Sequence, residues 1–161
     1  MGQMIRVGMA DLNICRSPDA ITTLGLGSCV GAVIFDPTHK IAGLAHVMLP
    51  DSTSVRNNSN VAKFADTGLE ELYRRMIKIG AAKVGLKAKI AGGAQMFAFN
   101  ANNDMLRVGD RNVEAVKKKL AQLGIPIIAQ DTGKNFGRTI EFYPETGELL
   151  VRAVGKSVYK I

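Results

Sequence analysis

The chain has 161 residues, of which 47% are hydrophobic and 22% are charged, and its formal net charge is +7. This length and composition are typical of a single globular domain, here residues 1–161, with a sizeable core. No apolar run approaches the roughly 20 residues of a membrane-spanning helix, and the first residues lack the apolar stretch of a secretory signal, so we expect a cytoplasmic protein without membrane insertion.

The excess of basic side chains favours acidic partners, either nucleic acid or a negatively charged protein. Aromatic residues make up only 6% of the chain and Trp is absent. The longest basic run, residues 117–119, falls within an expected helix and reads as a solvated face. Because surfaces that bind nucleic acid interleave basic and aromatic side chains, the sequence disfavours a nucleic-acid partner.

The first third of the chain is expected to be mostly β-strand. A loosely alternating segment at residues 6–13 suggests a strand and a turn, and Ser17-Pro18-Asp19 is a turn signal. A short strand then leads into a glycine-rich turn at residues 25–28. Two apolar runs, separated by a turn at Asp36-Pro37, read as buried neighbouring strands. The expected strands after the first turn are residues 21–24, 30–35 and 41–48.

The remaining residues predict two helices and several strands. After a polar loop at residues 51–60, apolar residues recur at helical spacing over 61–79, where Asn60 can cap the start, and again over 110–123. Further strands are expected at residues 86–91, 125–130, 139–143 and 149–154, the last two joined by a hairpin turn. Many strands with two separated helices predict an α+β domain whose sheets are largely antiparallel.

The residues most capable of chemistry are Cys29 and His46. Cys29 follows the glycine-rich turn, and His46 lies in the second apolar run. A cysteine attacks carbon well only when a base or a cation lies beside it. We expect a thiol activated in this way to be alkylated at pH values well below about 8.5, the usual pKa of a cysteine. Because neighbouring strands lie about 5 Å apart, the two expected strands could bring these side chains together.

Each of these residues also has a structural interpretation. A free cysteine is most often a small buried core residue, and this is how we interpret Cys15. A lone histidine in an apolar run is more often a core or edge residue than a base. Cys15 and Cys29 could form one disulfide, but a reducing compartment favours free thiols. Zinc is not expected, because Cys15, Cys29, His39 and His46 lack the close spacing of a structural site.

Five blocks of this sequence resemble one known family. They are LGLGSCV at 24–30, AHVMLP at 45–50, GGAQMF at 92–97, VGDRN at 108–112 and DTGKNFGR at 131–138. The chain is similar over nearly its whole length to CheD, the glutamine deamidases that act on chemoreceptors in bacterial and archaeal chemotaxis. Lys134 stands where that family more often has a second glycine.

The resemblance implies a three-layer α/β/β sandwich with two main helices and a cysteine hydrolase activity without metal or organic cofactor. By resemblance, Cys29 matches the nucleophile, His46 the base, and Thr23 the third polar member of the catalytic set, with Thr22 the obvious confusion. The backbone at Gly27 and Ser28 is expected to hold the oxyanion. The match also covers Arg111 and Asn112. For these two residues the sequence does not decide between a role in the fold and a contact with substrate.

The reaction that the resemblance implies is hydrolysis of a receptor glutamine to glutamate through a thioester, with ammonia released. The same route allows hydrolysis of receptor glutamate methyl esters. The expected substrate is the cytoplasmic helices of chemoreceptors, which are often rich in Glu and would be attracted to a basic surface. The alternative is a binding partner without catalysis, which docks onto the phosphatase CheC and stimulates it.

Overall fold

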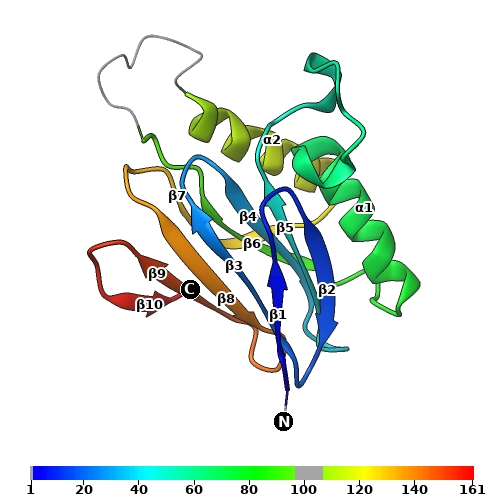
Figure 1. Ribbon diagram of the computed structural model, residues 1–161. Coiled ribbons are helices and arrows are strands. Elements are labelled where there is room, and N and C mark those ends of the chain that lie inside the picture. Colours follow the sequence, from blue (N-terminus) through cyan, green and yellow to red (C-terminus); the bar gives the residue numbers. More distant parts are fainter. Residues whose placement is uncertain (1, 97–106) are drawn as a thin grey trace.

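The structure, a computed structural model, describes residues 2–96 and 107–161. In these residues two five-stranded sheets pack face to face, and two helices cover the far side of one sheet (Figure 1). We call the sheet between the two other layers the central sheet and the remaining sheet the outer sheet. The three layers form an α/β/β sandwich, which agrees with the α+β class predicted from the sequence and with the layers that the resemblance implied.

The outer sheet has the strand order β1-β3-β8-β9-β10. Its strands are β1 (Met4–Val7), β3 (Ala20–Leu26), β8 (Arg138–Tyr143), β9 (Glu148–Ala153) and β10 (Val158–Lys160). The central sheet has the order β2-β5-β4-β6-β7. Its strands are β2 (Leu12–Arg16), β5 (Ile41–Val47), β4 (Val30–Asp36), β6 (Lys87–Gly92) and β7 (Ile127–Thr132).

Most strand pairs are antiparallel, as expected. Among the described strands, only β1 with β3 and β6 with β7 are parallel. The helices are α1 (Ala65–Lys78) and α2 (Val108–Gln122), and two short 3₁₀ turns, η1 (Ser52–Ser54) and η2 (Val61–Lys63), precede α1. Within the described part of the chain, no helix is both long enough and apolar enough to cross a membrane.

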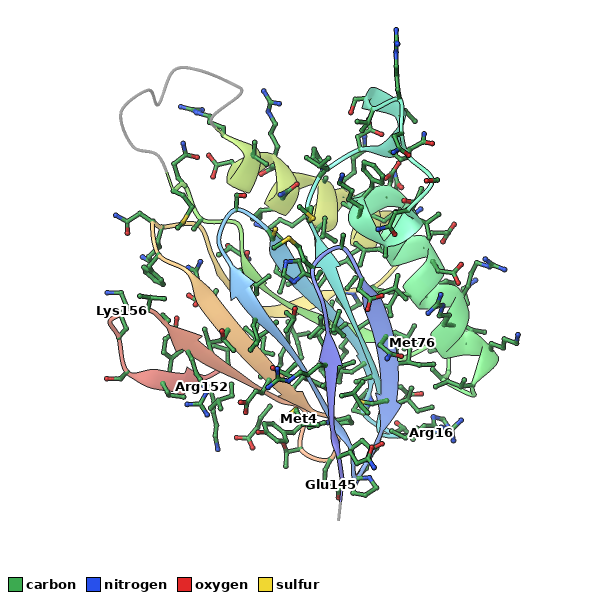
Figure 2. The ribbon with its side chains drawn as sticks, in the orientation of Figure 1. Met4, Arg16, Met76, Glu145, Arg152 and Lys156 are labelled. Carbon is green, nitrogen blue, oxygen red and sulfur yellow. The ribbon has the colours of Figure 1, made fainter. Side chains whose placement is uncertain are left out.

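Burial explains why β4 and β5 are continuous apolar runs. Every residue of both strands is buried, because helices cover one face of the central sheet and the outer sheet covers the other. Met76 of α1, for example, packs over Gly43 of β5 on the helical side (Figure 2). Strands β8 and β9 instead alternate between buried and more exposed residues, because only one face of the outer sheet meets the core.

Several of the expected elements differ from those in the structure. The helix expected at 61–79 is divided at Phe64, whose extended backbone forms a bridge with Leu49. Strand β3 runs on to Leu26, past the expected end at residue 24, through an irregularity in its pairing with β8 at which Gly25 has a φ of +68°. The last strand, β10, was missed because its three residues are exposed or half-buried and carry no apolar run.

Candidate active site

Cys29 lies in the turn between β3 and β4, half-buried and with a free thiol. Two backbone hydrogen bonds hold this turn against the segment that follows β6. The Gly93 N–H donates to the carbonyl of Cys29 at 2.8 Å, and the Ala94 N–H donates to the carbonyl of Gly27 at 2.9 Å. Gly92 has a φ of +110°, and a Cβ there would lie 2.3 Å from the Cys29 oxygen, so this approach requires glycine.

The alternation of β4 places Cys29 on the side of the outer sheet. Val33 and Phe35 belong to the core between the two sheets, and Gly31 continues the same two-residue period. A Cβ on Gly31 would lie 2.6 Å from Ile140 of β8, so this face is closely covered. Cys29 is the next residue in the series, and its side chain packs against the same core.

His46 projects into this same space from β5. It is paired with Gly31 in the β4–β5 ladder, and only 1% of it is exposed. Cys29 is two residues before Gly31, so Cys29 and His46 occupy diagonal positions on one face of the sheet. Such positions are about 7–8 Å apart, which is within reach of long side chains. The glycine between them contributes no side chain.

Thr23 of β3 determines which nitrogen of His46 carries the proton. Its Oγ1 lies 2.7 Å from His46 Nδ1 and donates to the carbonyl of Val7 at 2.8 Å. A hydroxyl has one proton, and the carbonyl can only accept, so Thr23 must accept from Nδ1–H. His46 Nε2 is then the unprotonated nitrogen, and it is buried without a hydrogen-bond partner in the described part of the chain.

Thr22 points elsewhere. Its hydroxyl donates to the carbonyl of Ile140 on the neighbouring strand at 2.6 Å. The structure therefore brings Thr23, and not Thr22, into contact with His46. The Cys29 thiol and His46 Nε2 are not hydrogen-bonded to each other, since Nε2 has no partner among the described residues.

Burial sets the protonation of the site. It raises the pKa of the Cys29 thiol above 9.0 and lowers the pKa of His46 below 6.5. The resting pair at neutral pH is therefore a neutral thiol and a neutral imidazole. This is opposite to the low thiol pKa expected from the sequence, because desolvation disfavours the thiolate. Nε2 remains available as a base at neutral pH.

The peptide groups of the turn are oriented by bonds to their carbonyls. The carbonyl of Ser28 accepts from Nδ2 of Asn112 on α2 at 2.9 Å, in addition to the bonds at Gly27 and Cys29. In a trans peptide the N–H points opposite to the carbonyl, so the N–H groups of Ser28 and Cys29 point away from these donors. Within the described residues, neither N–H donates to a protein acceptor.

The other candidate ligands lie apart from this site. Cys15 of β2 is buried, as expected for a core residue, and burial together with Asp19 raises the pKa of its thiol to about 12. His39 lies in the turn at the other end of the β4–β5 hairpin, where its Nδ1 is 2.7 Å from Asp36. Across the described ranges, no three His, Cys, Asp or Glu side chains gather closely enough to hold a metal ion.

The block at residues 131–138 forms a loop closed around Arg138. This buried side chain donates to Asp131 at 2.9 Å and to the carbonyl of Gly133 at 3.0 Å. Lys134 has a φ of +62°, in the region that favours glycine, and its carbonyl accepts from the Gln95 N–H at 2.8 Å. The last residue of the neighbouring block, Phe97, lies outside the described residues.

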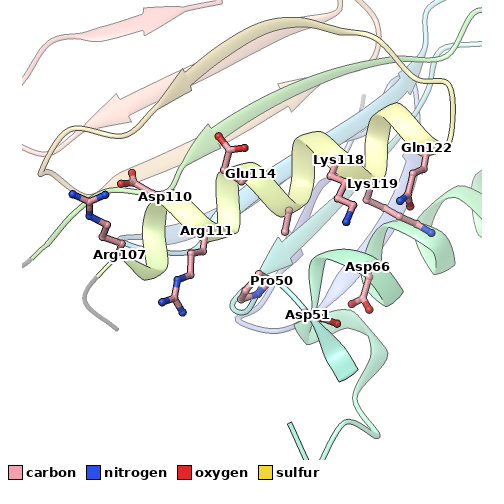
Figure 3. A pocket seen from close by; sticks show the side chains of 11 residues that line it. Pro50, Asp51, Asp66, Arg107, Asp110, Arg111, Glu114, Lys118, Lys119 and Gln122 are labelled. Atoms are coloured by element: carbon pink, nitrogen blue, oxygen red, sulfur yellow. The ribbon is translucent and has the colours of Figure 1, made fainter. Parts of the chain in front are cut away.

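A groove of about 940 Å³ lies along the exposed face of α2 and contains none of the three predicted catalytic residues (Figure 3). It is lined by charged side chains of both signs, including Arg111, and by Pro50 and Asp51 at its other wall. Asn112 is fully buried on the opposite face of the helix. The sequence had not decided between a role in the fold and a contact with substrate for Arg111 and Asn112. The structure places the two residues on opposite faces of α2, with Arg111 in the groove and Asn112 in the interior.

Comparisons with known proteins agree with the resemblance. A sequence model of the CheD family, described as CheD chemotactic sensory transduction, matches residues 48–153. The chain is 67% identical, over the whole length of both proteins, to the probable chemoreceptor glutamine deamidase CheD of Lachnoclostridium phytofermentans. It is 57% identical to the chemoreceptor glutamine deamidase CheD of Halalkalibacterium halodurans, with 96% of each chain covered. For that of Bacillus licheniformis the identity is 54%, covering 98% of this chain and 95% of the relative.

Proposed function

The chain belongs to the CheD family, and on this premise we propose that it hydrolyses the side-chain amide of specific chemoreceptor glutamines to glutamate. The names of its relatives support the substrate and the reaction. The observation that carries the catalytic assignment is the Thr23–His46 contact, which leaves a free lone pair on Nε2 at the face that bears Cys29.

In the first step, His46 Nε2 takes the proton of the Cys29 thiol as the sulfur attacks the carboxamide carbon. A carbon–sulfur bond forms, and the carbonyl electron pair moves onto oxygen. The N–H groups of Ser28 and Cys29, which the turn leaves without protein acceptors, stabilise this oxyanion. Because the resting thiol is neutral, deprotonation accompanies attack rather than preceding it.

In the second step, the His46 imidazolium returns the proton to the amide nitrogen. The carbon–nitrogen bond breaks, ammonia leaves, and the acyl group remains on Cys29 as a thioester. Water then attacks with Nε2 as base, and glutamate leaves as the thiol is restored. Thr23 accepts from Nδ1–H throughout and orients the ring, although a neutral hydroxyl stabilises the imidazolium less than a carboxylate would. A receptor glutamate methyl ester would react by the same route, with methanol leaving.

The test is mass spectrometry of a chemoreceptor cytoplasmic fragment after incubation with the wild type, with Cys29→Ala and with His46→Ala. The wild type should convert glutamine to glutamate at defined positions, and both variants should lose this conversion. Retained conversion by Cys29→Ala would rule out the proposed nucleophile. A methyl-esterified fragment assayed in parallel tests the methylesterase activity.

The same variants, assayed also for stimulation of the CheC phosphatase, distinguish hydrolysis from the binding alternative. A protein that acts only by docking onto CheC would convert no glutamine, and Cys29→Ala would stimulate the CheC phosphatase as well as the wild type does. No described contact favours that alternative over hydrolysis, whereas the oriented imidazole has an obvious use in hydrolysis.

A further inference from the structure

Asn112 connects the two segments that carry the nucleophile and the base. Its Nδ2 donates to the carbonyl of Ser28 and to the carbonyl of Met48, each at 2.9 Å. Both partners can only accept, so the nitrogen, and not the oxygen, of the side-chain amide must face them. Ser28 directly precedes Cys29, and Met48 follows His46 by two residues.

This bridge lies where the sheet no longer holds the two segments together. The β4–β5 ladder ends at the pair Val30 and Val47. Cys29 and Met48 both lie one residue beyond it. The Asn112 amide therefore fixes the distance between the turn and the end of β5 from outside the sheet. It also holds the Ser28 carbonyl towards α2, which aims the Cys29 N–H in the opposite direction.

A role in packing alone does not explain why this position carries an asparagine. Asn112 is fully buried, and its Oδ1 has no hydrogen-bond partner within the residues that the structure describes. A buried acceptor without a partner is unfavourable, and an apolar residue would fill this position on α2 without that penalty. What an apolar residue could not supply is the pair of donated hydrogen bonds.

We propose that Asn112 is a positioning residue, which holds the Cys29 turn in register with His46 for the deamidation described above. The inference rests on that proposed function for its catalytic readout. It assigns Asn112 no contact with substrate. Its loss should therefore lower kcat and leave KM nearly unchanged, because the geometry of attack changes while substrate contacts do not.

The test compares Asn112→Asp, which replaces the donor by an acceptor of nearly the same shape, with Val116→Ala as the matched control. Val116 is also fully buried on α2, and its truncation weakens packing without touching either carbonyl. At a temperature where all variants are folded by circular dichroism, Asn112→Asp should lower kcat by roughly tenfold or more, and Val116→Ala should not. Equal losses in the two variants would overturn the proposal. If Asn112→Asp does not fold, Asn112→Ala takes its place.

A second readout does not require deamidation. The alkylation rate of Cys29 by iodoacetamide is measured in the wild type, in His46→Asn, in Asn112→Asp and in the double variant, with Cys29 identified by peptide mapping. If Asn112 holds the thiol near the imidazole, His46→Asn slows alkylation in the wild type but hardly at all in the Asn112→Asp background. Independent, multiplicative effects would refute the positioning role. A wild type that deamidates nothing but shows the coupling would refute only the proposed function.

Discussion

A single hydroxyl proton determines the chemistry of His46. Because Thr23 donates to Val7, it accepts from Nδ1, and the basic nitrogen is left on the side of Cys29. Neighbouring Thr22 carries the same hydroxyl on the same strand, but that hydroxyl bonds to Ile140. The pair therefore provides a matched test of the orienting role.

We expect Thr23→Val, which keeps the shape and removes the hydroxyl, to lower kcat by roughly tenfold to a hundredfold, a part of what a general base contributes. Thr23→Ser should retain most of the activity. Thr22→Val should cost about 1 kcal/mol of stability for one lost hydrogen bond and leave kcat unchanged. Steady-state kinetics and denaturant unfolding measure these effects, and a larger kcat loss in the Thr22 variant would contradict the assignment.

The direction of each pKa shift predicts the pH profile. Burial lowers the pKa of His46 below 6.5, so the base stays neutral at that pH and activity falls only in more acidic buffer. Burial raises the pKa of Cys29, so alkylation of the free enzyme should keep accelerating through pH 9.0. Measurements of the deamidation rate and of the alkylation rate in buffers from acid to alkaline pH check both predictions. Alkylation that levels off near neutrality would instead indicate a preformed thiolate.

Among the elements, the turn between β3 and β4 depends most on backbone contact. Gly92→Ala places a methyl group against the carbonyl oxygen of Cys29, which cannot move without moving the nucleophile. We expect a loss of about 2 kcal/mol or more in the free energy of unfolding, together with loss of activity. Gly124→Ala is the control, because Gly124 also has a positive φ but a Cβ there meets nothing within 4 Å. It should cost only about 1 kcal/mol and keep full activity.

The elements also show what the sequence could predict. Continuous apolar runs predicted β4 and β5, and helical periodicity predicted most of α1 and α2, because burial on a defined face determines those patterns. The break at Phe64 depends on its bridge with Leu49, and the short β10 pairs with β9 through residues that are exposed or half-buried, so neither feature leaves a local apolar pattern. For the site, the resemblance indicated Cys29, His46 and Thr23. The bridge from Asn112 joins three distant segments, so no spacing in the sequence could reveal it.

At the scale of the molecule, strands of the central sheet contribute to both cores, and β4 is an example. Val30, Ala32 and Ile34 of β4 belong to the core beneath the helices, and its intervening residues Val33 and Phe35 belong to the core between the sheets. Exposing either core removes support from the other. We therefore propose that residues 1–161 are a single domain that unfolds in one cooperative transition.

Two probes of different layers test this prediction. Helical circular dichroism reports on α1 and α2, and labelling of the buried Cys15 thiol in the Cys29→Ala variant reports on the core between the sheets. Their denaturant midpoints should coincide. Separate midpoints would show that the layers unfold independently and would contradict the single-domain proposal.

The central claim is that the sulfur of Cys29 becomes covalently joined to the substrate acyl group. The most direct measurement is acid quenching of the enzyme during turnover of a glutamine-bearing receptor fragment, followed by digestion and mass spectrometry. The account predicts a thioester adduct on the peptide that contains Cys29 in the wild type, and no adduct on that peptide in Cys29→Ala. Conversion of glutamine with no adduct on Cys29, and undiminished in Cys29→Ala, would contradict it.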